Sequence, residues 1–164
     1  MDQEILNDIK RLYQAAGIIC TNIKIESESL EYTAATFQLN TKKIIFRVAK
    51  ITPTKIGQFV TIWKRNQESI TTPFEYTDAF DFIIIVTRKE NQVGQFIFPK
   101  SILLDRGIVS GSNKEGKRGI RVYPPWDKTE SKQAKNTQQW QLNYFLDYSI
   151  GLNAERLKKL LSPI

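Results

Sequence analysis

The first part of the chain has apolar side chains that recur every three or four positions. They are Ile5, Leu6, Ile9, Leu12, Tyr13 and Ala16. This spacing places them on one face of an α-helix, and Gly17 stands where a helix often ends. The pattern therefore predicts an amphipathic helix that opens the chain.

From Tyr32 onward, apolar and polar positions alternate with the period of a β-strand. The alternation predicts three consecutive strands, whose apolar faces are Phe37 with Leu39, then Ile44 with Phe46 and Val48, then Val60 with Ile62. Residues 80–88 are apolar on both faces, which is typical of a strand in the middle of a sheet that is covered on both sides.

The remaining segments predict shorter elements. Residues 95–99 and 120–123 read as strands, residues 101–105 as a helical turn, and residues 131–149 and 154–161 as helices. This order of elements predicts a single α+β domain over residues 1–164 with α/β/α layers. Its central sheet is expected to be mixed, largely antiparallel and flanked by helices.

Composition narrows the class of protein. With 164 residues, of which 41% are apolar, the chain can bury one sizeable core. Its first residues lack the features of a secretory signal and its apolar runs are short, so we expect a cytoplasmic location and no membrane partner. The single Cys20 suits a reducing compartment. The absence of histidine excludes imidazole acid–base chemistry and His-containing zinc sites.

The net charge of +7 is localised. Residues 32–67 contain no Asp or Glu and seven basic residues, whereas the charges in the two flanking segments together cancel. The seven are Lys42, Lys43, Arg47, Lys50, Lys55, Lys64 and Arg65. Positive charge gathered on one surface attracts phosphate backbones, so this stretch predicts DNA or RNA as the partner.

The turn between the second and third of these strands carries the first candidate site. Lys50 shares the alternation of Ile44 and Val48, so it is expected at the core side of the strand, at the rim of a groove. Thr54 and Lys55 in the adjoining turn add donors for an anion. The alternative is an ordinary solvated lysine at the end of a strand.

Three tryptophans lie near basic residues, and aromatic faces stack on the bases of single strands. Trp63 follows the alternation of Phe59, which also fits a core position. Trp126 is either a surface stacking residue or an anchor for its loop. Trp140 follows Lys132 and Lys135. These residues predict a preference for single strands.

Residues 111–117 match the G-x-x-x-x-G-K core of a phosphate loop. Arg118 stands where that loop needs Ser or Thr, and Pro124 and Pro125 follow where it needs a helix. We therefore expect no ATPase, only a basic loop in which Lys117 and Arg118 can contact phosphate. The tripeptide Gly-Gln-Phe occurs twice, at residues 57–59 and 94–96. It indicates either two similar strand starts or a polar groove shared by Gln58 and Gln95.

Four segments resemble the MepB family: RVAKITPTKIGQFVTIWKR at residues 47–65, GQFIFPK at 94–100, RVYPPW at 121–126 and TQQWQLNYF at 137–145. The resemblance spans about residues 28–147. It implies a bacterial protein, an association with a multidrug-efflux operon, and a fold similar to that of PD-(D/E)XK endonucleases.

Cleavage in that fold needs carboxylates that hold a divalent metal beside a lysine, with an acid two residues before the lysine on a core strand. Here Val48 precedes Lys50 and Ile62 precedes Lys64 at that offset. The acid-x-lysine triplets at residues 8–10, 115–117 and 130–132 lie outside the predicted core strands. Glu26, Glu28, Glu31, Asp78 and Asp81 are possible replacements or, alternatively, ordinary surface acids.

The sequence thus predicts a non-catalytic protein of nuclease-like fold, without a cofactor or metal, that binds DNA or RNA mainly through phosphates. The alternatives are a magnesium-dependent nuclease with a displaced acid, and a module that binds a small ligand or a protein. The predicted contacts are Arg47, Lys50, Thr54, Lys55, Gln58, Lys64, Arg65, Gln95, Lys100, Lys117, Arg118, Arg121 and Trp126.

Overall fold

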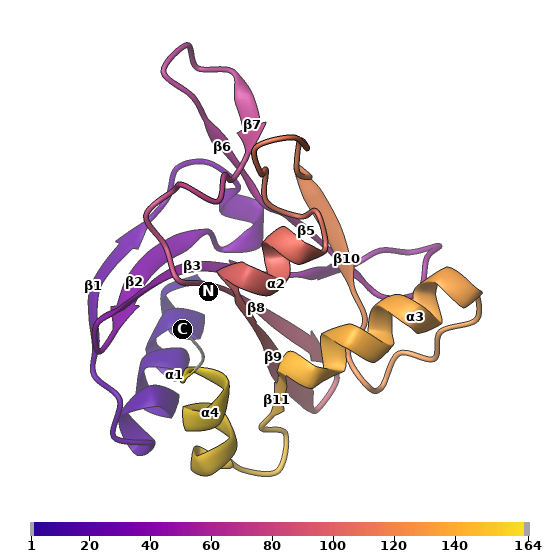
Figure 1. Cartoon of the computed structure of the whole chain (residues 1–164). Helices are drawn as coiled ribbons and strands as arrows, with labels where there is room; N and C mark the ends of the chain where they lie inside the picture. Colours follow the sequence, from indigo (N-terminus) through magenta and orange to yellow (C-terminus); the bar gives the residue numbers. More distant parts are fainter. Residues whose placement is uncertain (1, 163–164) are drawn as a thin grey trace.

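A computed structural model describes residues 2–162 and contains a six-stranded sheet in the order β1-β2-β3-β8-β9-β11 (Figure 1). Its strands are β1 Cys20–Ile25, β2 Ala35–Leu39, β3 Lys42–Val48, β8 Phe82–Lys89, β9 Gln92–Pro99 and β11 Phe145–Asp147. The pair β3–β8 is parallel and the other neighbours are antiparallel. The predicted α+β class with a mixed, largely antiparallel sheet is confirmed.

Two helices cover one face of this sheet. They are α1 Asp2–Ala15 and α4 Ala154–Leu160, which lie together in Figure 1. The apolar face predicted for the first helix packs here, because Ile5, Ile9 and Tyr13 belong to the same buried cluster as Phe46 and Ile84. Leu157 and Leu160 extend that cluster from α4. The even-numbered residues of β3 and β8 therefore face the two terminal helices.

The other face of the sheet supports the candidate site. A second buried cluster joins Ile45, Ile83 and Phe98 to the small sheet β10-β5-β4 and to two helices. The bounds are β4 Lys50–Ile51, β5 Gln58–Thr61, β10 Gly119–Val122, α2 Lys100–Asp105 and α3 Lys132–Gln141. As predicted, β8 lies inside the sheet and is buried on both faces along residues 82–87.

A two-stranded hairpin, β6 Trp63–Arg65 with β7 Thr71–Pro73, projects from one end of the molecule (Figure 1). No apolar pattern predicts it. The edge strand β1 was also missed, since its residues after Cys20 are exposed. The helix predicted over residues 131–149 ends at Gln141, and the chain then forms β11 against β9.

The prediction that Lys50 shares the core side of β3 is wrong. The strand ends at Val48, the N–H of Ala49 donates to Val86, and the chain changes direction before Lys50 pairs with Phe59 of β5. This bend interrupts the alternation, so the side chain of Lys50 is half-exposed. No helix within residues 2–162 has the length and apolar character needed to cross a membrane.

Candidate functional site

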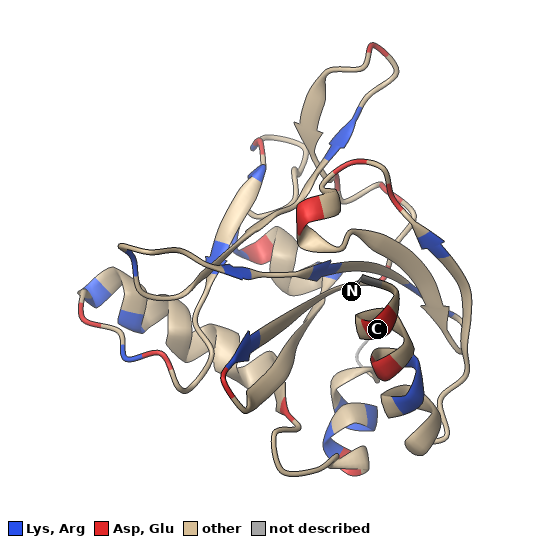
Figure 2. Cartoon of the chain, turned by 180° about the vertical axis from the view of Figure 1, so that it is seen from behind, with Lys and Arg blue, Asp and Glu red and all other residues tan. Residues whose placement is uncertain are grey.

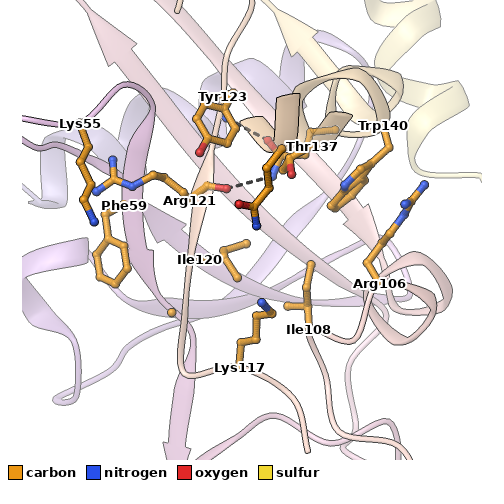
Figure 3. Close-up of a pocket in the computed structure, with 13 residues that line it drawn as sticks. Lys55, Phe59, Arg106, Ile108, Lys117, Ile120, Arg121, Tyr123, Thr137 and Trp140 are labelled. Carbon is orange, nitrogen blue, oxygen red and sulfur yellow. Dashed lines mark hydrogen bonds between the residues drawn. The ribbon is translucent and has the colours of Figure 1, made fainter. Parts of the chain in front are cut away.

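A pocket of about 440 Å³ lies between the strands β5 and β10 and the helix α3 (Figure 3). We call it the basic pocket. It is lined by Lys55, Phe59, Arg106, Ile108, Lys117, Gly119, Ile120, Arg121, Tyr123, Gln133, Thr137, Trp140 and Gln141. Four of these side chains are cationic and three are aromatic, and the lining contains no Asp or Glu.

None of the four cations of the basic pocket forms an ion pair within residues 2–162. Lys55, Arg106 and Lys117 are exposed, and Arg121 is half-buried. Because no carboxylate lines the pocket, their charges add to a positive potential at one place on the surface. The arrangement is suited to an anionic ligand.

The two arginines are held against aromatic rings. Arg121 donates from Nη1 to the carbonyls of Ile56 and Gly57, at 3.3 Å each, and its guanidinium carbon lies 5.9 Å from the centre of the Phe59 ring. The guanidinium carbon of Arg106 lies 5.1 Å from the centre of Trp140. Such contacts restrict the side chains, so less freedom is lost when an anion binds.

Two glutamines of α3 fix the wall of the basic pocket. The buried Gln141 accepts from the N–H of Tyr123 and donates to the carbonyl of Arg121. Gln138 donates from Nε2 to the carbonyls of Pro124 and Asp127, at 2.9 Å each. These bonds attach the end of β10 and the following turn to the helix. The β10 side of the pocket is thus tied to α3, whereas Lys55 and Lys117 lie in loops.

Three other predicted cations lie beside carboxylates. Lys64 Nζ lies 2.7 Å from Asp78 and 3.1 Å from Glu75, Arg65 Nε lies 2.9 Å from Glu28, and Lys50 Nζ lies 4.0 Å from Glu31. We call Lys50, Lys64 and Arg65 the paired cations. Figure 2 colours basic residues blue and acidic residues red over this region.

The environment of Lys64 illustrates the pairing. Desolvation lowers its pKa, but hydrogen bonds and charge attraction from Asp78 and Glu75 outweigh that cost, so the net pKa is raised. Lys64 therefore stays charged and engaged at neutral pH. A phosphate would have to compete with two carboxylates for this ammonium.

The other predicted site residues fall into different environments. Thr54 is exposed in the β4–β5 loop next to Lys55. Lys100 is half-buried, donates to the carbonyl of Asp78 and lies over the rings of Tyr76 and Phe80. Arg118 pairs with Glu115 at 3.2 Å. Of the predicted residues, the structure brings Lys55, Lys117 and Arg121 together in the basic pocket.

The groove predicted between Gln58 and Gln95 does not exist, because both side chains are buried. Gln95 accepts from Tyr13 and donates to Tyr148 beneath α1, whereas Gln58 lies in the small sheet and donates to the carbonyl of Arg88. The interpretation as two similar strand starts is the one that fits. Neither side chain is placed to contact a ligand at the surface.

The tryptophans also differ from one another. Trp126 packs edge-on against Phe145 at 5.7 Å between ring centres, which fits a loop anchor better than a stacking residue. Trp63 is only half-buried, with Arg65 over its ring at 5.3 Å, so its predicted core position is wrong. Trp140 lines the basic pocket.

Comparison with protein families matches residues 26–147 to the MepB-like family. The chain belongs to the MepB-like family. It is also similar to the crystal structure of MepB, with 32% sequence identity and a TM-score of 0.77 over 88% of this chain and 95% of that chain.

A bacterial homing endonuclease aligns with 84% of this MepB-like chain and 85% of its own, at 14% identity and a TM-score of 0.46. Comparison with curated proteins gave no match.

This MepB-like chain has a second pocket, of about 370 Å³, beside the paired cations. We call it the Arg47 pocket. It is lined by Glu26, Glu28, Thr36, Ile45, Arg47, Trp63, Lys64, Arg65, Phe74, Asp78, Ala79 and Phe80. Arg47, predicted as a surface contact, is only 3% exposed. Burial lowers its pKa to about 10, although the charge of Glu26 opposes this shift.

The residues of the Arg47 pocket do not fit a metal ion. Arg47 is a cation on a core strand, yet Ile45 stands two residues before it, and Thr36 lies opposite Ile45 in β2. Of the three acids in the lining, Asp78 binds Lys64 and Glu28 binds Arg65, which leaves Glu26 as a single unpaired carboxylate. Within residues 2–162 there is no group of three or more His, Cys, Asp or Glu side chains that could hold a metal.

Some of the residues that line the two pockets could not be predicted from the sequence. Arg106 directly follows a short helical turn, and nothing in the local pattern separates it from any exposed arginine. The aromatic residues Tyr123 and Trp140 were noted only as parts of motifs or near basic residues. Their convergence depends on α3 packing across β10, which is a contact between distant segments.

Proposed function

We propose that this MepB-like chain binds nucleic acid through the basic pocket, mainly by contacts to phosphate. The observation that carries the proposal is that Lys55, Arg106, Lys117 and Arg121 line one pocket whose lining contains no Asp or Glu. Cations that neutralise phosphates release counterions, which gives affinity without dependence on sequence. Lys50 and Lys64, which the sequence also predicts as contacts, lie beside carboxylates outside this pocket.

The shape of the basic pocket favours single strands over duplexes. Its volume is that of a small-ligand site, and Ile108, Ile120 and Tyr123 add apolar surface beside the cations. Unpaired bases can stack on aromatic rings or on the guanidinium plane of an arginine, whereas paired bases remain inside the duplex. A single strand can therefore use both parts of the lining.

The chain is proposed to bind without cleaving. This part rests on the donor set of β3, where Ile45 occupies the position at which an acid would accompany the cation Arg47. A link to drug response is a prediction of the family resemblance alone.

The binding experiment compares two triple variants that remove the same charge. Lys55→Gln, Lys117→Gln and Arg121→Gln change the basic pocket, and Lys50→Gln, Lys64→Gln and Arg65→Gln change the paired cations. Fluorescence anisotropy of a labelled single strand is recorded between about 50 and 200 mM salt. The first variant is expected to reduce the slope of log affinity against log salt by about 2, and the second by less than about 1.

Thermal unfolding of both variants checks that the fold is retained. Equal slopes for the two variants would place the interface outside the basic pocket. A wild-type chain whose affinity does not change with salt would favour the small-ligand or protein-binding alternative.

The nuclease alternative has its own assay. Purified chain is incubated with plasmid, single-stranded DNA and RNA in the presence of Mg²⁺ or Mn²⁺, and no cleavage is expected. Cleavage that disappears in the variant Glu26→Gln would show a working metal site and contradict the proposal. Cleavage that is unchanged in this variant and in Arg47→Lys would indicate a contaminating nuclease.

A further inference from the structure

The guanidinium of Arg47 is buried in the middle of the fold without a carboxylate partner. Nε donates to the carbonyl of Thr61 at 3.1 Å, and Nη1 donates to the carbonyl of Phe46 at 2.9 Å. Nη2 has no hydrogen-bond partner within residues 2–162. A buried charge without an ion pair is costly, so such a group is a candidate for binding a ligand.

Glu26 is the complementary group in the same pocket. Its carboxylate accepts one long bond, 3.4 Å, from the hydroxyl of Thr36 and forms no ion pair within the described residues. Glu28, Lys64, Arg65 and Asp78 also line the pocket, but these four are joined in ion pairs. Arg47 and Glu26 are therefore the two charged groups of the Arg47 pocket that remain available.

The apolar part of the lining is mainly aromatic. Trp63, Phe74 and Phe80 line it together with Ile45. Phe74 is fixed by an edge-on contact with Phe80 at 6.0 Å and lies beneath the guanidinium of Arg47 at 5.9 Å. At about 370 Å³, the space lies at the small end of ligand pockets. It is suited to a planar group with polar edges.

We propose that the Arg47 pocket binds the base of one unpaired guanine. Guanine presents two acceptors, O6 and N7, on one edge, and an arginine fork can donate to both. The adjoining edge carries the donors N1–H and N2–H₂, which a carboxylate such as that of Glu26 can accept. A face of the base packs against the indole of Trp63, over which Arg65 also lies at 5.3 Å.

The other bases match this pair of charges less well. Adenine has a donor, N6–H₂, next to N7, and this donor would face the N–H groups of Arg47. Cytosine and uracil have a single ring and cover less of the aromatic wall. Phosphate alone makes no use of Glu26, the carboxylate of the lining that forms no ion pair within residues 2–162.

The inference rests on the proposed function, because a bound strand brings the base to the pocket. One stretch of chain contributes to both pockets. Phe59 lines the basic pocket, and Trp63, four residues later, lines the Arg47 pocket. At the rise of an extended chain, these two residues are within about 13 Å of each other. A strand held by phosphate contacts at the first pocket can therefore reach the second.

The test compares base analogues in one otherwise constant single strand. Anisotropy is measured for strands that carry guanine, adenine, hypoxanthine or 7-deazaguanine at a single central position. Guanine is expected to bind about tenfold tighter than adenine. Hypoxanthine lacks the N2 amino group that faces Glu26, and 7-deazaguanine lacks the N7 acceptor that faces Arg47, so both are expected between these limits.

Two variants test which edge of the base faces Glu26 and which faces Arg47. Glu26→Gln, which keeps one acceptor oxygen but loses the charge, should reduce the difference between guanine and hypoxanthine while the penalty for 7-deazaguanine persists. Arg47→Lys should reduce the 7-deazaguanine penalty, with thermal unfolding as the check that the buried site is intact. The analogue series in the wild-type chain needs no substitution, so the inference remains testable if Arg47→Lys does not fold.

The outcomes separate the inference from the function on which it rests. Equal affinity for all four strands, with the salt slope retained, would overturn the guanine pocket and leave the proposed function standing. Absence of binding to any strand, and to guanosine monophosphate, would remove both. Binding of free guanosine monophosphate but not adenosine monophosphate, lost in Glu26→Gln, would support the pocket with a free nucleotide as its ligand.

Discussion

The basic pocket and the region of the paired cations contain similar basic side chains, but the acidic residues around them differ. Lys55, Lys117 and Arg121 line a pocket without Asp or Glu in its lining, whereas Lys64 and Arg65 each contact a carboxylate within 3 Å. The acids in the second region come from segments before and after the acid-free stretch, namely Glu28, Glu31, Glu75 and Asp78. Charge counted along a sequence therefore differs from charge at a surface.

Adding acids to the basic pocket should make it behave like the paired region. Gln133→Glu and Thr137→Glu introduce two carboxylates on α3 facing the cations of the pocket. We expect the salt slope for a single strand to fall by about 2, because the new acids neutralise cations and repel phosphate. The matched control is Gln139→Glu with Asn143→Glu, which adds the same charge at exposed positions outside the lining. An equal fall of the salt slope in the control would show that the position of the added acids does not matter.

Removing acids from the paired region should have the opposite and smaller effect. Glu28→Gln and Asp78→Asn release Arg65 and Lys64 from their carboxylates. We expect the salt slope to rise by about 1, since one or two further cations can then meet phosphate. Glu4→Gln with Asp8→Asn removes the same charge on α1 and serves as the control. Unchanged binding in the released variant would mean that this region lies away from the nucleic acid.

A substitution at Gln141, which joins α3 to β10, tests whether the basic pocket is preformed or is a loose cluster of cations. Gln141→Ala leaves the N–H of Tyr123 and the carbonyl of Arg121 without their partner. We expect the free energy of unfolding to fall by about 1 to 3 kcal/mol in urea denaturation, and affinity to fall severalfold. Gln139→Ala on the exposed face of α3 should change neither quantity. Weaker stability with full affinity would show that the wall does not organise binding.

The pH dependence of Lys64 gives the smallest effect. Desolvation lowers its pKa, but Asp78 and Glu75 raise it more, so its folded-state pKa lies above the usual value of 10.5. Its contribution to stability is then complete below pH 10.5 and is lost as the pH rises through the folded-state value. Relative to Lys64→Met, the wild-type chain should lose less than about 1 kcal/mol extra in alkaline urea denaturation. A larger wild-type advantage at high pH would contradict this sign.

Periodic segments made much of the fold predictable. The face of α1 has apolar positions three or four residues apart, the strands β2 and β3 have a period of two, and β8 is a run that is apolar on both faces. The strand Phe145–Asp147 has only three residues and follows a helix directly, so no local period distinguishes it. The β6–β7 hairpin is short and mostly exposed, and its sequence lacks an apolar face.

The candidate site was predictable only in part, for a physical reason. Lys55, Lys117 and Arg121 were identified because cations near loops and strand ends are visible in the sequence. Their convergence, and the neutralisation of Lys64 by Asp78, depend on contacts between segments far apart in the chain. The burial of Arg47 could not be predicted for the same reason. It was expected at the surface, but segments distant in the sequence cover it.

The ion pairs of Lys64 and Arg65 join different segments, so they exist only after folding. An unfolded chain carries the seven cations of residues 32–67 with no acid among them, and a polyanion can hold that stretch as readily as a folded surface. Any ligand with affinity for the unfolded chain reduces the stabilisation that it gives to the native state. Nucleic acid can therefore act both as a partner of the folded protein and as a competitor of its refolding.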